Sequence, residues 1–207
     1  MNKYIKAIIE KLNAEYPDAD CTLSYSDPLQ LLVATQLAAQ CTDVRVNIVM
    51  EDLVVKYPDV YAYATADLEE LTEYVRTTGF FRNKAKNIIG TCRKIVSDFG
   101  GEVPQSMAEL LTLPGVGRKT ANLVLGDAFD VPGIVVDTHA GRLARRMGLT
   151  EHADPYRVEL DLLKIIPKEM QTKFCHQLVS HGRKYCRSQR PLCVDCPLGN
   201  VCRKVGF

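Results

Sequence analysis

Apolar residues recur with a helical period along most of the chain. Near the N-terminus, one helical face collects Ile5, Ile8, Ile9 and Leu12. Ser26-Asp27-Pro28 has the pattern of a helix start, because a capping side chain precedes a proline in the first turn. The nearly all-apolar segment 29–40 follows, and a helix that is apolar all round belongs at the centre of a helical domain.

The rest of the chain continues this helical pattern. Further helices are expected at 43–57, 67–77, 83–99, 106–111, 118–126, 139–148, 155–166 and 168–185. The β-branched segment 131–136 contains Pro132 and Gly133 and has no second strand to pair with. We interpret it as an extended connector, so residues 128–137 mark a candidate boundary between two domains. The pattern therefore predicts an all-α fold.

Composition and charge narrow the class of protein. A chain of 207 residues can form one large domain or two small ones. No apolar run approaches the roughly 18 residues that span a bilayer, and the N-terminus does not have the pattern of a signal peptide. We therefore expect a cytoplasmic protein with no membrane partner. From residue 138 onward, the chain has thirteen Lys and Arg but only six Asp and Glu. This excess of positive charge suits either one wall of a polyanion-binding cleft or a solvated surface.

Eight cysteines in a cytosolic chain favour a metal over disulfides. Four of them form the run Cys186-x6-Cys193-x2-Cys196-x5-Cys202. Four thiolates bind either Zn²⁺ or a [4Fe–4S] cluster, and the spacing alone does not decide between the two. The other four cysteines are scattered in apolar or helical surroundings and are expected to be small core residues.

The segment LPGVGRKTAN at 113–122 reads as a tight glycine turn that opens directly into a helix. Gly115 and Gly117 can let an anion approach the backbone without a Cβ in the way. Arg118 and Lys119 follow at the helix start, where cations oppose the macrodipole and a bound anion would offset that cost. An ordinary helical hairpin has the same outline, but the whole string favours a turn that binds phosphate.

Two side chains near this turn carry candidate chemistry. Lys119 lies at the mouth of the helix, where a reaction on bound nucleic acid would need a nucleophile. Asp137 follows in Val136-Asp137-Thr138-His139, after the connector. Taken singly, Lys119 could be a phosphate-binding lysine and Asp137 a helix N-cap. Their joint occurrence favours a site that binds DNA and attacks it.

Residues 113–122 together with 136–139 resemble the helix-hairpin-helix glycosylases of base excision repair, and the endonuclease III family in particular. The resemblance covers nearly the whole chain. It implies two helical lobes with a helix-hairpin-helix motif, a C-terminal [4Fe–4S] cluster loop and a DNA cleft between the lobes. It assigns 21–131 to a six-helix barrel domain that contains the motif (about 107–126). An iron–sulfur cluster domain would combine 1–20 with 132–207.

By this resemblance, Lys119 matches the lysine that attacks C1′ of a damaged nucleotide, and Asp137 matches the essential aspartate. The attack expels the base and leaves an imine, and loss of a C2′ proton then breaks the 3′ phosphate bond by β-elimination. Asp137 could stabilise the cationic sugar, deprotonate Lys119 or shuttle protons. The sequence leaves these three roles open.

The resemblance also implies a set of DNA contacts, namely Gln40, Phe80, Gly115, Val116, Gly117, Arg118, Thr120 and His139. Gln40 matches the glutamine that enters the space of an extruded nucleotide. Phe80 lies where the family carries an apolar wedge, more commonly a leucine, and this departure leaves the opposite-base preference open. The plain alternatives are core packing for Phe80 and a helix end for Gln40.

Three further features follow from the resemblance. The carbonyls of Leu111, Leu113 and Val116 match those that hold a monovalent cation. The cysteine spacing matches the family's [4Fe–4S] loop, for which we expect a structural role. Ala140-Gly141 stands where many relatives carry bulkier residues, which suggests a roomier pocket.

The predicted function is that of a monomeric DNA glycosylase and abasic-site lyase that repairs double-stranded DNA with oxidised pyrimidines or abasic sites, in the cytoplasm at the nucleoid. An adenine-mismatch glycosylase is an alternative, although those relatives generally lack the lysine at position 119. A non-catalytic iron–sulfur DNA-binding module is the second alternative. Such a module would have no use for Lys119 together with Asp137.

Overall fold

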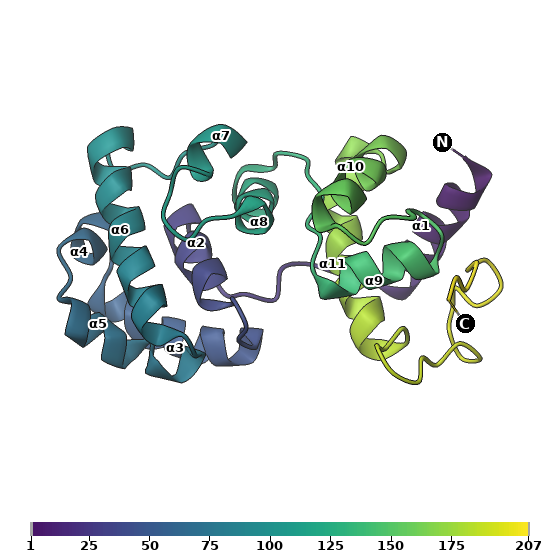
Figure 1. Ribbon diagram of the computed structural model, residues 1–207, viewed down its shortest axis with the longest axis horizontal. Coiled ribbons are helices and arrows are strands. Elements are labelled where there is room, and N and C mark those ends of the chain that lie inside the picture. Colours follow the sequence, from purple (N-terminus) through teal and green to yellow (C-terminus); the bar gives the residue numbers. More distant parts are fainter. Residues whose placement is uncertain (1, 207) are drawn as a thin grey trace. The chain divides into compact units, whose positions relative to one another are not determined.

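The computed structural model describes residues 2–206, and helices are its regular elements (Figure 1). No strand forms within that range, in agreement with the predicted all-α class. The chain divides into two compact units. We name Thr22–Val131 the continuous unit and Met1–Cys21 with Pro132–Phe207 the discontinuous unit.

The continuous unit holds the helices from α2 to α8. Their bounds are α2 (Pro28–Leu37), α3 (Asp43–Lys56), α4 (Val60–Ala64), α5 (Leu68–Tyr74), the 3-10 turn η1 (Arg76–Thr78), α6 (Phe81–Phe99), α7 (Met107–Leu110) and α8 (Arg118–Phe129). Asp27 caps α2 by accepting the Gln30 N–H at 2.9 Å, and Pro28 occupies the first turn, as the sequence predicts. All residues of α2 from 31 to 37 are buried, and α2 packs against α3, α6 and α8. The apolar helix is therefore central to its unit.

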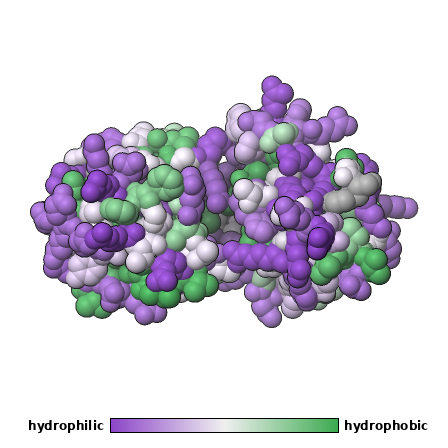
Figure 2. All heavy atoms as spheres, turned by 60° about the horizontal axis from the view of Figure 1, so that its bottom comes forward, coloured by the Kyte–Doolittle hydropathy of each residue, from purple (hydrophilic) through white to green (hydrophobic). Residues whose placement is uncertain are grey.

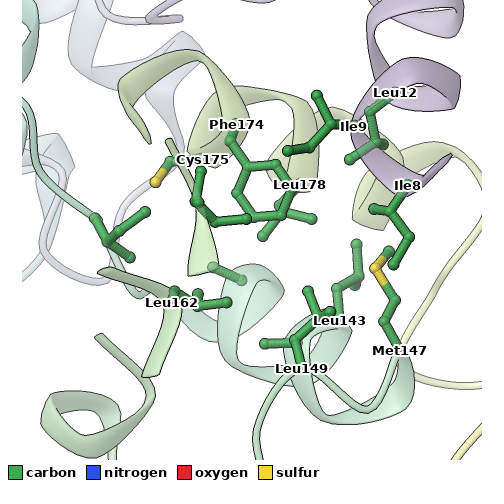
Figure 3. Close-up of a cluster of buried hydrophobic side chains, with 14 of the residues drawn as sticks. Ile8, Ile9, Leu12, Leu143, Met147, Leu149, Leu162, Phe174, Cys175 and Leu178 are labelled. Atoms are coloured by element: carbon green, nitrogen blue, oxygen red, sulfur yellow. The ribbon is translucent and has the colours of Figure 1, made fainter. Parts of the chain in front are cut away.

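The discontinuous unit joins the N-terminal helix to the helices that follow the connector. Its elements are α1 (Lys3–Glu15), α9 (Thr138–Arg146), α10 (Pro155–Ile165), the 3-10 turn η2 (Lys168–Met170) and α11 (Gln171–Lys184). Figure 3 shows its core, in which residues of α1 meet residues of α9, α10 and α11. Leu12, Leu143, Leu162 and Leu178 are fully buried there. The predicted apolar face of the first helix thus closes a core built mostly from the C-terminal part.

Several helix ends differ from the sequence prediction. The second helix ends at Leu37 rather than at Gln40, and Gln40 itself adopts a left-handed conformation with φ +56°. The short helix α4 was not predicted, although Asp59 caps it by accepting the Ala62 N–H at 2.8 Å. The connector carries no regular structure from 130 to 137, and its Ile134 is fully buried in the discontinuous unit.

The surface carries a mixture of residue types. On the face drawn in Figure 2, hydrophilic residues predominate and hydrophobic ones form small groups. Within residues 2–206, none of the helices has the length and apolar character needed to cross a membrane.

Candidate active site

The glycine turn of 113–117 links α7 to α8, as the sequence predicts for a helical hairpin. Ser106 opens α7, and its hydroxyl accepts the Glu109 N–H while donating to the Glu109 carboxylate at 2.6 Å. Within the turn, the Val116 N–H donates to the Leu113 carbonyl at 3.2 Å. Gly117 is the N-cap of α8 and supplies no capping side chain. The first turn of α8 therefore presents its positive end without a side-chain cap.

Gly115 is the residue on which this turn depends. Its φ of +72° lies in the left-handed region that favours glycine. A Cβ at this position would lie 2.6 Å from Asn87 Nδ2 and 2.9 Å from Asn87 Cγ, on α6. Both the backbone conformation and the packing therefore require glycine here.

Two buried polar side chains hold the turn from behind. The Pro114 carbonyl accepts hydrogen bonds from Gln36 Nε2 at 2.9 Å and from Thr91 Oγ1 at 2.8 Å. Gln36 Nε2 also donates to Thr91 Oγ1 at 3.0 Å. A Cβ on Gly90 would lie 3.3 Å from Pro114 Cγ, so that glycine lets the turn approach α6 closely. The hairpin is thus fixed to α2 and α6.

Lys119 is the second residue of α8 and is exposed. Its neighbours Arg118 and Thr120 are half-buried. Val116 is 7% exposed, so its side chain belongs to the core of the turn and a DNA contact there would involve its backbone. The structure accordingly brings an accessible amine, a positive helix end and a rigid glycine turn into one place within the continuous unit.

Gln40 and Phe80 lie in two other turns of the same unit. Gln40 is exposed, and the Phe80 side chain is 63% exposed, which contradicts the alternative of core packing for Phe80. Both residues have left-handed backbones, with φ +56° at Gln40 and +49° at Phe80. Non-glycine residues adopt this conformation rarely, and it recurs at functional sites.

Asp137 and His139 lie in the discontinuous unit, at the start of α9. Asp137 is the N-cap of α9, and its Oδ1 accepts the Ala140 N–H at 2.7 Å. His139 Nδ1 lies 3.1 Å from Arg142 Nη2. Because a guanidinium can only donate, Nδ1 accepts and the neutral ring carries its proton on Nε2. On α11, a Cβ at Gly182 would lie 2.5 Å from His139 Nδ1, so this glycine makes room for the histidine.

Ala140 does not line an open pocket. It is 1% exposed and packs in the core of the discontinuous unit. For Ala140, the expectation that a small residue widens a substrate pocket is therefore wrong, because its side chain faces the core.

The four C-terminal cysteines line one cavity of the discontinuous unit. Arg146 Nη1 donates to Cys186 Sγ and the Lys204 N–H donates to Cys202 Sγ, each at 3.4 Å. A Cβ at Gly199 would lie 2.9 Å from the Cys193 carbonyl, so the loop closes around a glycine. Four sulfurs that share a cavity, two of which accept N–H donors, match the donor set of a thiolate-bound metal group.

The electrostatics of this cavity agree with that donor set. Burial raises the pKa of the Cys196 and Cys202 thiols, and the other cysteines of the set raise it further. A bound cation would offset both effects, because metal binding requires deprotonated thiols and stabilises them. Burial also lowers the pKa of His181 to about 4, so the imidazole near Cys196 is neutral at pH 7.

Two arginines of α9 connect Asp137's helix to the cysteine loop. Arg142 donates to the Cys186 carbonyl through Nε at 3.1 Å and Nη2 at 2.9 Å. Arg146 donates to the Arg187 carbonyl at 2.6 Å. The predicted site residues thus form two groups, one in each unit: the hairpin with Lys119, Gln40 and Phe80, and α9 with the cysteines.

Sequence reasoning missed the residues that support these groups. Gln36 and Thr91 hold the hairpin, and Arg142 and Arg146 hold the cysteine loop. A polar residue inside an apolar helix was the available signal for Gln36, since buried polar groups need partners. For the other three residues, the pattern along the chain contained no such signal.

Comparison with known proteins places this geometry in context. Residues 33–168 match the HhH-GPD superfamily of base excision DNA repair proteins. The chain is 54% identical to endonuclease III of Synechocystis sp. over 96% of its length and 90% of that protein. It is 44% identical to endonuclease III of Bacillus subtilis over 98% of its length and 93% of that protein.

A solved structure agrees with these relatives. It is a trapped endonuclease III–DNA covalent intermediate, an estranged-adenine complex, and it matches with a TM-score of 0.92 and 42% identity. The match covers 99% of this chain and 97% of that one. Such identity over the full length, together with a shared fold, establishes kinship rather than a common architecture alone. The chain belongs to the endonuclease III family, the bifunctional DNA glycosylases and abasic-site lyases of the HhH-GPD superfamily.

Proposed function

We propose that this protein removes oxidised pyrimidines from double-stranded DNA and cleaves the resulting abasic strand through a Schiff base on Lys119. The observation that carries the proposal is the position of Lys119. It is an exposed amine in the first turn of a helix that no side chain caps, directly after a glycine turn held by Gln36 and Thr91. Such a place suits a nucleophile that works beside a bound phosphate.

The reaction forms a bond from Lys119 Nζ to C1′ of the damaged nucleotide while the C1′–base bond breaks. The departing base takes the electron pair and a proton, and the nitrogen loses its protons as the sugar ring opens to an imine. Removal of a C2′ proton then forms a double bond between C2′ and C3′, and the 3′ phosphate leaves. Asp137 would serve as the carboxylate for these steps, either by stabilising the cationic sugar or by moving protons.

The hairpin would bind the DNA backbone. Gly115 and Gly117 are exposed, and the turn leads into the positive end of α8. Arg118 and Thr120 lie in the first turn of the same helix and would add a charge and a hydroxyl to the phosphate contact. The carbonyls of Leu111, Leu113 and Val116 remain the proposed ligands of a monovalent cation there.

Gln40 and Phe80 would fill the duplex where the damaged nucleotide is extruded. An amide can replace lost base-pairing partners, and an apolar ring can replace lost stacking. His139, which is half-buried in the first turn of α9, would contact the DNA. The support for these roles is that all three side chains lie in turns or at a helix start.

Cys186, Cys193, Cys196 and Cys202 would hold a [4Fe–4S] cluster, whose bonds to the four thiolates cross-link the C-terminal loop. Its contribution here is structural, because glycosylase and β-elimination chemistry involve no change of oxidation state. The loop is fixed to α9 by Arg142 and Arg146. An ordered loop would therefore keep the helix of Asp137 in place.

A panel of duplexes tests the proposal. The wild-type protein is expected to cleave duplexes that carry thymine glycol or an abasic site, and Lys119→Ala is expected to cleave neither. Release of adenine opposite oxoguanine without strand cleavage would instead indicate an adenine-mismatch glycosylase. Binding without any cleavage would indicate a non-catalytic module. The protein is expected to act as a monomer, which the elution volume in size-exclusion chromatography will check.

A further inference from the structure

The Gln40 and Phe80 turns share an unusual backbone. Each side chain is exposed, and each residue has a left-handed φ without being glycine. For an L-residue this conformation is unfavourable, because Cβ crowds the following carbonyl oxygen. Such strain persists only where the surrounding structure holds it. The two turns follow different elements, α2 and η1.

Lys84 of α6 contacts both turns. Its ammonium donates to the Leu37 carbonyl at 2.8 Å and to the Thr78 carbonyl at 2.7 Å. Leu37 is the last residue of α2 and precedes Gln40 by three positions, and Thr78 is the last residue of η1 and precedes Phe80 by two. One side chain thus connects the segments from which both strained turns begin.

The environment of Lys84 is unfavourable for a cation, because it is buried. The residue is 5% exposed, and burial lowers the pKa of its amine. A buried charge is costly unless hydrogen bonds compensate it. The Lys84 N–H also donates to the Phe80 carbonyl at 3.1 Å, so the same residue fixes the start of α6. A methionine, which is neutral and of similar length, would fill this space at lower cost but could not donate to either carbonyl.

We propose that Lys84 is a positioning residue that fixes the Gln40 and Phe80 turns as one pair, so that both side chains enter damaged duplex DNA together. This inference rests on the proposed function, in which those two side chains fill the space of an extruded nucleotide. Lys84 acts through the backbone, because its buried ammonium binds protein carbonyls. Turns that are loose before binding must be ordered on binding, which weakens insertion.

Two substrates separate positioning from plain stability. A single-stranded abasic oligonucleotide needs the Lys119 reaction but has no opposite strand to fill. The matching abasic duplex needs the Lys119 reaction and also the insertion of Gln40 and Phe80. Single-turnover cleavage rates on the two give a ratio that general destabilisation does not change. Lys84→Met is expected to lower the duplex rate by about 10- to 100-fold, the size of effect that misplaced groups cause. Its single-strand rate should stay within about twofold of wild type.

Arg93 provides a matched control on the same helix. Its Nε donates to the Ala64 carbonyl at 2.8 Å, at the end of α4, which leads to neither turn. Arg93→Met therefore removes the same kind of bond and should leave the duplex-to-single-strand ratio at the wild-type value. Where Lys84→Met does not fold, Lys84→Gln keeps N–H donors on a shorter side chain and is expected to lower the ratio by a smaller factor.

Gln40→Ala and Phe80→Ala distinguish failure of this inference from failure of the proposed function. If neither lowers the ratio, the proposed insertion roles are wrong, and the inference about Lys84 is wrong with them. If both lower it while the Lys84 variants do not, only the inference about Lys84 is overturned. Equal losses on both substrates in Lys84→Met would also overturn it. Adding Lys84→Met to the Gln40→Ala/Phe80→Ala double variant should cause little further loss, because Lys84 acts through those residues.

Discussion

Replacing Asp137 with asparagine separates the two tasks of this carboxylate. As a cap, Oδ1 accepts the Ala140 N–H at 2.7 Å, and asparagine offers a carbonyl oxygen in its place. Loss of a cap costs about 1 kcal/mol, which corresponds to roughly 2–4 °C in Tm for a chain of this size. Asp137→Ala should lose that amount. Asp137→Asn should lose less, because only the charge at the helix N-terminus is removed, at about 0.3–1 kcal/mol.

The proposed chemistry predicts a different order for activity. An amide neither takes up a proton as a carboxylate does nor carries its charge, so both variants should excise thymine glycol at least about 100-fold more slowly in single turnover. Asp154 is the matched control, since it caps α10 by accepting the Arg157 N–H at 3.0 Å. Asp154→Asn should keep the wild-type rate. A wild-type rate in Asp137→Asn, with slowing only in Asp137→Ala, would mean that Asp137 is merely a cap.

Substitutions also test the hairpin, the cysteine loop and the core of the discontinuous unit. Gly115→Ala should lower both Tm and affinity for an abasic-analogue duplex in fluorescence anisotropy. Gly101 is the control, because it has φ +92° and an added Cβ would lie 2.8 Å from Tyr61 Oη. Gly101→Ala should lower Tm without changing the affinity. Unchanged affinity in Gly115→Ala would refute the role of the hairpin. Purified protein should be yellow-brown and contain iron and sulfide. Cys202→Ser should lower the content of both. Colourless protein with stoichiometric zinc would contradict the proposed cluster. Ala140→Ile should overpack the core and cost about 1–3 kcal/mol in unfolding experiments, and a changed lesion preference at unchanged stability would contradict its burial.

Local signals made much of this fold predictable. The start of α2 follows from Asp27 and Pro28, and the start of α3 follows from Thr42, whose hydroxyl accepts the Arg45 N–H at 3.3 Å. The glycine turn and the exposed lysine after it are also visible as a string of neighbouring residues. In each case the residues that determine the conformation lie within a few positions of one another.

The unpredicted features depend on distant partners. The segment directly after Leu37 has no proline or glycine to end a helix. The Leu37 carbonyl is instead bound by Lys84, 47 positions away. Gln36 binds the Pro114 carbonyl 78 positions away. The family resemblance suggested a pocket at Ala140, whereas its side chain packs against residues of α1, α10 and α11 that are distant in the sequence. Such contacts require the folded chain, because no neighbouring residue indicates them.

Borohydride trapping tests whether Lys119 is the nucleophile. Reduction of the reaction with an abasic duplex should convert the imine into a stable covalent adduct, which mass spectrometry of its peptides should locate on Lys119. Lys119→Ala should give no adduct while still binding the duplex. An adduct on another residue of the wild-type protein, or one that forms as readily in Lys119→Ala, would show that Lys119 is not the nucleophile.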